Sequence, residues 1–329
     1  MKKIMTLFIV GLLIIVAGCS GDSADGSGGV TLKLAHTGSD THQYQIASEK
    51  FKELVEEKSN GQVTIEIHGN ATLGSEGEAV QQVMDGTLDM TTVAAGSAFA
   101  NTVPSFKVFG IPYLFKDREH VYSVLDGKIG DDLLSKVDEH GMKGLGWWEV
   151  GFRHLTNSRG PIKKPEDVDG LKIRVQPTAV WEEHMKALGA TPTPIAFNEL
   201  YSALDQGVVD GQENPLATIN SMKFYEVQEY VALTAHAYTP AVVVMGNNAW
   251  KKLNEDQQKA VQSAVNETRD YIRQTLKEKD EKIINKLKEK GVTVTRPDRQ
   301  AFREATKNVK EAVSEQVPSE LIKRIKNQE

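Results

Sequence analysis

Hydrophobic and polar positions along the first third of the chain predict strands and helices in turn. Residues 31–36 (TLKLAH) and 62–69 (QVTIEIHG) alternate with the period of a strand. Residues 44–61 place apolar side chains at helical spacing and end at a glycine. Residues 78–94 (EAVQQVMDGTLDMTTVA) predict a helix, a turn at Gly86 and another strand. This β-α-β-α-β order indicates an α/β fold with a largely parallel sheet.

The second half of the chain continues this alternation. Residues 169–176 (DGLKIRVQ) predict a strand, residues 179–190 a helix, and residues 231–247 a long β-rich passage. From 255 to 290, apolar residues recur at helical spacing among many charged ones, which predicts one long, half-exposed helix. A short strand in residues 291–297 and two amphipathic helices are expected to close the chain.

Residues 1–18 have the layout of a secretory signal. Two lysines are followed by an apolar run over residues 4–16 and then by two small residues. The run is shorter than the roughly 20 residues of an ordinary transmembrane helix, so a membrane span is the less favoured alternative. The only cysteine, Cys19, comes next, and residues 19–29 (CSGDSADGSGG) are rich in Gly, Ser and Asp. Such a composition predicts a flexible tether.

Charge and length narrow the class of protein. The 329 residues include 39 Lys and Arg and 45 Asp and Glu, a formal net charge of −6, which becomes −8 once Lys2 and Lys3 are removed with the signal. An acidic chain is a poor candidate for nucleic-acid binding, and any anionic ligand must be met by a local cluster of donors. Without Cys19 the chain has no cysteine for disulfides. About 300 residues favour two domains.

Local signatures of enzymes are missing from the sequence. The segment GLGWWE, residues 144–149, breaks the dinucleotide-binding glycine pattern, and in AGSAF the residue Phe99 replaces the last glycine of a nucleophile elbow. No two of the eight histidines have the i, i+4 spacing of a helical zinc site. We therefore expect no enzymatic activity, no cofactor and no metal. An active site assembled from distant residues remains an alternative.

Two arginines in predicted strands are the candidate residues for binding an anionic ligand. Arg174 lies between Ile173 and Val175, where a buried strand normally carries apolar side chains. A guanidinium there can hold a carboxylate with two parallel hydrogen bonds, at the strand end where open α/β sheets bind ligands. The alternatives are an edge strand with Arg174 in solvent, or a structural salt bridge. Arg153 lies in a second strand-like segment and is weaker evidence on its own.

Residues 208–219 (VVDGQENPLATI) predict a turn followed by a helix. Asn214 suits the N-cap of that helix and Pro215 its first position. Free N–H groups at such an N-terminus attract anions, although a plain capped helix is the alternative. Phe197 is a candidate aromatic wall for a ligand.

The segment from 151 to 238, GFRHLTNS through TAHAY, resembles the core of the extracytoplasmic solute-binding proteins of TRAP (tripartite ATP-independent periplasmic) transporters, the DctP-type family. ATLGSEGEAVQQVMDGTLDM (71–90), FGIPYLF (109–115) and the long helix follow in family order, so the resemblance covers almost the whole mature chain. Residues 16–19 (VAGC) also resemble a bacterial lipobox, in which the cysteine is lipidated.

The resemblance implies a two-lobed periplasmic-binding-protein-like α/β fold with a hinge and a long helix crossing both lobes. We expect residues 30–150 and 240–279 to form lobe I and residues 151–239 and 280–329 to form lobe II. In the family, one arginine binds the ligand carboxylate, and a second arginine, an asparagine and an aromatic residue also contact the ligand. More variable residues form the rest of the pocket wall. These positions correspond to Arg174, Arg153, Asn214 and Phe197, and to Thr37, Glu76, Ser97 and Tyr238. Gln176-Pro177 departs from the family pattern at the pocket rim and leaves the identity of the ligand open.

The function that follows is capture of a small organic acid, a C4-dicarboxylate or a sugar acid, by hinge closure. The expected partners are the carboxylate ligand and the TRAP membrane subunits that receive it, with the protein acting as a monomer. Lipidated Cys19 is expected to anchor it at the outer face of the cell membrane. The alternative is a sensor that presents the bound acid to a membrane kinase.

Overall fold

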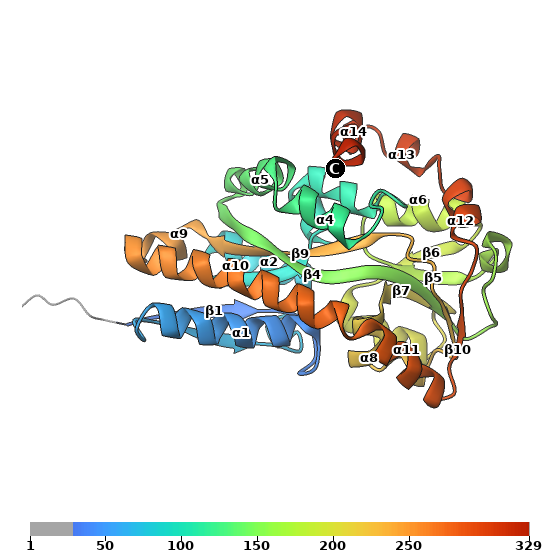
Figure 1. Ribbon diagram of the computed structural model, residues 1–329, viewed down its shortest axis with the longest axis horizontal. Helices are drawn as coiled ribbons and strands as arrows, with labels where there is room; N and C mark the ends of the chain where they lie inside the picture. The colour runs from blue at the N-terminus through green and yellow to red at the C-terminus, as the bar shows by residue number, and fades with distance from the viewer. Residues whose placement is uncertain (1–28, 329) are drawn as a thin grey trace, which may run out of the picture.

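The computed structural model describes residues 29–328 of the chain. Its strands form a mixed sheet in the order β2-β1-β3-β9-β4-β7-β5-β6, with β8 paired to both β4 and β10 (Figure 1). The strands are β1 (Val30–Ala35), β2 (Val63–His68), β3 (Met90–Ala94), β4 (Met142–Asn157), β5 (Lys172–Val175), β6 (Thr191–Pro194), β7 (Gly211–Pro215), β8 (Tyr230–Ala232), β9 (Tyr238–Gly246) and β10 (Thr293–Thr295).

The prediction of a largely parallel sheet was wrong at the centre of the sheet. β1 pairs in parallel with β2 and β3, and β5 pairs in parallel with β6 and β7, as the β-α-β alternation predicted. Between these groups, β4 and β9 pair antiparallel with each other and with the strands beside them. Alternation predicts a parallel pair only where a crossover helix joins the two strands, and no such unit joins β4 to β9.

β4 passes from one group of strands to the other. It pairs with β9 through residues 142–152 and with β7 through residues 153–157. Two register shifts interrupt its pairing with β9, and bulges of this kind bend a strand. At the second shift Gly151 has a φ of +124°, which a glycine adopts without strain, and a Cβ there would meet Pro215 at 3.3 Å. The bend thus turns the strand just before Arg153.

The change of partner along β4 divides the sheet into two lobes. The first lobe comprises β1, β2, β3, β9 and residues 142–152 of β4, and the second lobe comprises β5 to β8, β10 and residues 153–157. The change of partner in β4 falls two residues after the predicted lobe limit at 150/151. The predicted lobe limits themselves stay a prediction.

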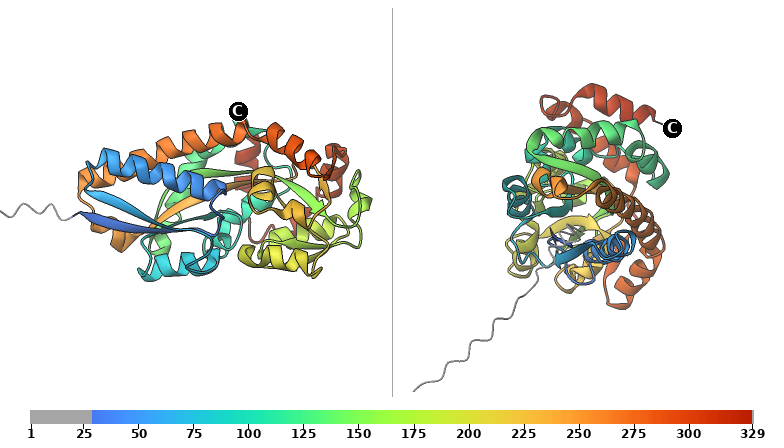
Figure 2. Two further views of the ribbon diagram at one scale, coloured as in Figure 1. Left: turned by 90° about the horizontal axis from the view of Figure 1, so that it is seen from below. Right: turned by 90° about the vertical axis from the view of Figure 1, so that its left-hand side faces the viewer.

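Helices cover both faces of the sheet. In the first lobe α1 and α10 lie side by side on one face and α2 lies on the opposite face (Figure 2). The helices of the structure are α1 (Gln43–Lys58), α2 (Glu76–Asp85), α3 (Phe99–Thr102), α4 (Arg118–Leu125), α5 (Lys128–Ser135), α6 (Ala179–Ala187), α7 (Leu200–Asp205), α8 (Leu216–Ser221), α9 (Asn247–Lys251), α10 (Glu255–Lys277), α11 (Asp280–Glu289), α12 (Arg299–Ala305), α13 (Val309–Ala312) and α14 (Ser319–Asn327). Most of them were predicted from the sequence.

The predicted single helix over residues 255–290 is two helices, because α10 ends at Lys277 and α11 begins at Asp280. Ile272 and Leu276 of α10 pack into the first-lobe core beside Phe51. The apolar residues of α11 pack instead into a separate second-lobe core. The break lets the chain change lobes, which a continuous apolar period does not reveal.

The C-terminal region has three short helices where two were predicted. It runs from β10 in the second lobe to α14, whose Arg324 donates to Asp132 of α5 over 2.7 Å. The carbonyl of Ile325 lies 2.8 Å from the ring of His120 in α4. The segment thus ties the two lobes together on the side of α4 and α5 (Figure 1). Within residues 29–328, no helix combines the length and hydrophobicity needed to span a membrane.

Candidate ligand-binding site

A small cavity lies between the lobes, bordered by side chains from α1, α2, β3, β4, β5, β7 and α8 and from the loops beside them. Polar and aromatic groups from both lobes meet in it. Its lining consists of His42, Tyr44, Glu76, Ala94, Ser97, Val150, Arg153, Arg174, Gln176, Phe197, Asn214 and Thr218.

The structure brings six of the eight predicted ligand-binding residues to this cavity: Arg174, Arg153, Asn214, Phe197, Glu76 and Ser97. Thr37 and Tyr238 are not among the lining residues. Thr37 is buried, and Tyr238 packs edge-on against Phe115 and Phe152 in the core. That the six bind a ligand stays a prediction.

Arg153 is held by a carboxylate that sequence reasoning missed. Its Nε and Nη2 donate to the side chain of Glu213 in β7, with Nη2 to Oε1 at 2.9 Å. Nη2 also donates to the Glu213 carbonyl at 2.6 Å and to Asn214 Oδ1 at 3.0 Å, and Nη1 donates to Thr239 Oγ1 at 3.2 Å. The guanidinium lies 5.2 Å from the ring of Trp181. Arg153 is therefore a charge-compensated group.

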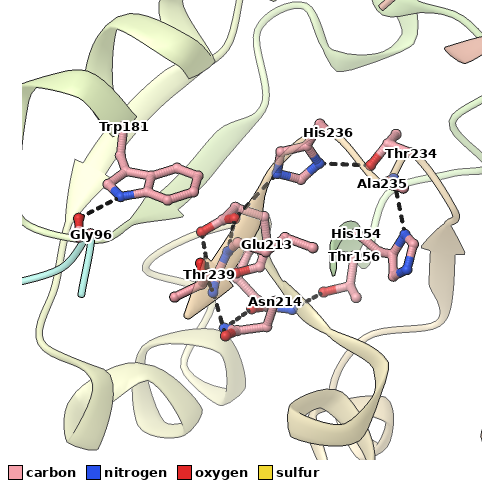
Figure 3. A network of polar contacts seen from close by, with 12 residues as sticks. Gly96, His154, Thr156, Trp181, Glu213, Asn214, Thr234, Ala235, His236 and Thr239 are labelled. Carbon is pink, nitrogen blue, oxygen red and sulfur yellow. Dashed lines mark hydrogen bonds and ion pairs between the residues drawn. The ribbon is translucent and has the colours of Figure 1, made fainter. Parts of the chain in front are cut away.

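Glu213 is ionised in this arrangement. Burial raises the pKa of Glu213, but the charge of Arg153 and the hydrogen bonds from His236 and Arg153 bring it down to about 2. His236 Nε2 lies 3.2 Å from Glu213 Oε2, and its Nδ1 lies 2.7 Å from Thr234 Oγ1 (Figure 3). Burial lowers the pKa of His236, so this ring is neutral near pH 7.

The segment around Asn214 corrects a second prediction. Asn214 is not a helix N-cap: it lies inside β7, opposite His154 of β4, and α8 begins only at Leu216. Its Nδ2 donates to Gln212 Oε1 over 2.6 Å, next to the Arg153 contact (Figure 3). The turn chemistry of residues 208–219 hid this short strand, and with it the position of Glu213 opposite β4. The burial of the whole strand is visible only in the structure, so no local signal in the sequence points to the ion pair.

Arg174 is the opposite case to Arg153. It is 1% exposed, its Nε donates to the carbonyl of Ile195 over 2.8 Å, and its Nη1 is buried with no hydrogen-bond partner in residues 29–328. Over the same residues no carboxylate lies within ion-pair distance of it. Burial, together with the charge of Arg153, lowers the pKa of Arg174 to about 10, although Glu213 and Glu76 oppose the shift. A buried cation without a counterion is costly, and an incoming carboxylate removes that cost.

Glu76, the first residue of α2, supplies the carboxylate of the lining. It is 7% exposed, and its Oε1 accepts hydrogen bonds from the backbone N–H of Ala94 at 3.1 Å and from Tyr44 Oη at 3.5 Å. Burial raises the pKa of Glu76 above its ordinary value, although Ser97, Ala94 and the two arginines oppose this. From sequence alone an acidic first-turn residue looks like ordinary helix capping.

The two walls of the cavity already touch. Gln43 of α1 donates through Nε2 to Thr218 Oγ1 of α8 over 2.7 Å, and the ring of His42 meets Phe197 edge-on at 5.9 Å. On another side, Trp181 Nε1 of α6 donates to the carbonyl of Gly96 over 2.9 Å (Figure 3). These contacts join the lobes on two sides of the cavity. Residues 29–328 hold no group of three or more His, Cys, Asp and Glu side chains suited to a metal ion.

Comparison with known proteins decides the family. Residues 34–316 match the model of the bacterial extracellular solute-binding proteins, family 7, also called DctP. This chain belongs to family 7. The resemblance inferred from the sequence is thereby confirmed.

Named relatives of this family 7 protein align with nearly its whole length. The 2,3-diketo-L-gulonate-binding periplasmic protein YiaO of Escherichia coli is 35% identical over 325 residues, which are 98% of this chain and 99% of YiaO. A TRAP periplasmic solute-binding protein from Polaromonas, bound to D-erythronate, has a TM-score of 0.88 and 35% identity, covering 91% of this chain and 99% of that one. One from Sulfurospirillum deleyianum, with bound succinate, has a TM-score of 0.87 and 32% identity, covering 91% and 99%.

These neighbours confirm the two-lobed α/β fold for this family 7 protein. The family consists of extracellular solute-binding proteins that serve transport. Solute binding is thus its general role.

Proposed function

We propose that this protein captures a small organic acid, a C4-dicarboxylate or a sugar acid, in the cavity between its lobes and delivers it to TRAP membrane subunits. The observation that carries the proposal is Arg174, a buried guanidinium at the cavity with no ion-pair partner in residues 29–328. A ligand carboxylate accepts two hydrogen bonds from such a group and supplies its missing counterion. The ligands named for the relatives, 2,3-diketo-L-gulonate, D-erythronate and succinate, are all carboxylates.

The other lining residues have complementary roles in this proposal. Arg153 fixes the wall beside Arg174 and keeps Asn214 in place, since it contacts both Glu213 and Asn214. Asn214 and Ser97 offer hydrogen bonds to ligand oxygens, and Phe197 covers the carbon skeleton. Removal of water from the closed cavity strengthens the interaction between Arg174 and the ligand, because the local dielectric constant falls.

Closure of the two lobes is part of the proposed mechanism. β4 and the junction between α10 and α11 join the lobes, and the bulges in β4 give that connection its bend. The contacts between Gln43 and Thr218 and between Trp181 and Gly96 then hold the closed form. A ligand that touches both walls shifts the population towards this form.

We also propose that the mature protein is a lipoprotein. Residues 1–18 serve as its signal peptide, and Cys19, the first mature residue, is lipidated and anchors the chain to the outer face of the cell membrane. Cys19 and most of the tether 19–29 lie outside the described residues. Eleven tether residues span at most about 35–40 Å, which keeps a monomeric binding protein near its membrane partners.

A thermal-shift screen of organic acids tests the proposed function. A ligand that binds only the folded state adds about 2.7 kcal/mol to the free energy of unfolding at 100 times its Kd. We expect at least one sugar acid or C4 acid to raise the Tm at millimolar concentration, while the corresponding neutral sugar alcohol does not. If no acid in such a panel raises the Tm, the proposal is wrong.

A further inference from the structure

The charges buried around the cavity are unevenly matched. Arg153 and Arg174 supply two positive charges, and both side chains are almost fully buried. Glu213 supplies one negative charge and is committed to Arg153. Glu76 is the only carboxylate among the lining residues, since Glu213 lies behind Arg153 and does not line the cavity. The cavity is therefore neutral when Glu76 is ionised, and it has one positive charge when Glu76 carries a proton.

The groups that face Glu76 do not supply another cation. From α1 and the loop before it come Tyr44 and His42, and His42 Nδ1 accepts a hydrogen bond from the Tyr44 backbone, so this ring is neutral. Burial also lowers the pKa of His42 to about 3. The end of β3 offers the Ala94 N–H, with Ser97 beyond it. β4 and β5 present Arg153 and Arg174, and the second-lobe wall is otherwise uncharged.

A ligand carboxylate on Arg174 changes this balance. It compensates the positive charge of Arg174, which until then balanced an ionised Glu76, so an ionised Glu76 would be left as a buried anion beside a second buried anion. Like charges at close range favour the protonated form of one of them, and a buried charge without a partner is costly. A proton on Glu76 Oε2 removes the excess charge and leaves the bond from Ala94 to Oε1 intact. The neutral carboxyl group can then donate to a ligand hydroxyl.

We propose that Glu76 takes up one proton when the ligand binds, and that the cavity consequently selects a hydroxylated monocarboxylate over a dicarboxylate. The inference rests on the proposed function and narrows its ligand class. A second ligand carboxylate would find no free cation among the lining residues. Because burial already raises the pKa of Glu76, part of the cost of protonation is met before the ligand arrives.

Isothermal titration calorimetry with matched acids tests this inference. D-Erythronate and tartrate both have four carbons, galactonate and galactarate both have six, and within each pair only the second is a diacid. Titrations at pH 6, 7, 8 and 9, each in two buffers that differ in ionisation enthalpy and contain neither phosphate nor a carboxylate, measure affinity and the number of protons taken up. We expect the monoacid to bind at least tenfold more tightly than its diacid. Its affinity should fall tenfold per pH unit above the pKa of ligand-free Glu76, with uptake approaching one proton.

Two variants test whether Glu76 is the group that takes up the proton. Glu76→Gln mimics the neutral carboxyl group, so it should bind the monoacid with no proton uptake and with an affinity that is flat from pH 6 to pH 9. Glu78→Gln changes an exposed carboxylate of the same helix and should behave like the wild type. Arg174, the proposed carboxylate-binding residue, is intact in both variants.

The outcomes separate this inference from the proposed function. Equal affinity for monoacid and diacid, or wild-type binding that is independent of pH and of buffer, overturns the role of Glu76 and leaves acid capture standing. Proton uptake that persists in Glu76→Gln also overturns it. If none of the four acids nor any other carboxylate binds, the proposed function fails and this inference fails with it.

Discussion

Arg153 and Glu213 form an ion pair between neighbouring strands β4 and β7, and both side chains are at most 2% exposed. The pair lies where β4 leaves β9 and joins β7. It neutralises one of two cavity arginines and leaves Arg174 without a counterion. We therefore infer different roles for the two arginines: Arg153 holds Asn214 in place, and Arg174 is available to a ligand.

Removal of Glu213 should destabilise the protein strongly. Glu213→Gln leaves the Arg153 charge buried and uncompensated, which typically costs about 3–5 kcal/mol. Urea unfolding of the ligand-free protein measures the change. The control is Glu183→Gln, which breaks an exposed pair with Lys186 and should cost less than about 1 kcal/mol. Equal losses in the two variants would contradict the structural role of the buried pair.

The same ion pair should make stability depend on pH in acid. The folded-state pKa of Glu213, about 2, is below its ordinary value of 4.5. A depressed pKa contributes stability that is complete above pH 4.5 and is lost as the pH falls towards 2. The free energy of unfolding, measured between pH 6 and pH 3, should therefore fall more steeply in the wild type than in Glu213→Gln. Parallel curves would show that Glu213 is not the group responsible.

The hydrogen bond between Trp181 and the Gly96 carbonyl should favour the closed form. Trp181→Phe keeps an aromatic ring under Arg153 but removes the donor, at a cost of about 1 kcal/mol or roughly fivefold in ligand affinity. Small-angle scattering of the ligand-free variant should give a larger radius of gyration than that of the wild type. Tyr201→Phe removes an exposed hydroxyl bonded to Glu226 and serves as the control. Unchanged scattering and affinity in Trp181→Phe would exclude this contact as a latch.

If Cys19 carries the lipid anchor, replacing it should change where the protein is found in the culture without changing how the protein binds its ligand. Cys19→Ala should release the protein into the medium or leave its signal unprocessed, while the purified protein binds its ligand with wild-type affinity. Cell fractionation followed by immunoblotting checks the first part, and calorimetry the second. A wild-type protein found wholly in the medium would rule out the anchor.

Much of the fold could be predicted from local patterns. The alternation in residues 31–36 and the helical spacing in residues 44–61 correspond to β1 and α1, because one face of each element is buried. Arg174 was also recognisable as a candidate ligand-binding residue, since a cation in a short strand between two apolar residues has few explanations. In both cases the deciding information lies within a few residues.

What could not be predicted depends on contacts between distant segments. Glu213 is 60 residues from Arg153, and only the pairing of β4 with β7 brings them together. The break after Lys277 exists because α10 and α11 pack into different cores, although the apolar period runs on through both. Asn214 has good capping chemistry, but the ladder with β4 takes its backbone into a strand. Tertiary pairing overrode local preference in each case.

The central claim is that Arg174 binds the carboxylate of the ligand. Calorimetry with the acid that gives the largest thermal shift tests it most directly, on wild type, Arg174→Ala and the control Arg159→Ala, whose arginine is exposed. Each charge-assisted hydrogen bond contributes about 1.5–3 kcal/mol, so Arg174→Ala should lower affinity at least tenfold. The ligand-free variant should unfold at no lower a urea concentration than the wild type, since it loses an uncompensated buried charge. Wild-type affinity in a folded Arg174→Ala protein would contradict the claim.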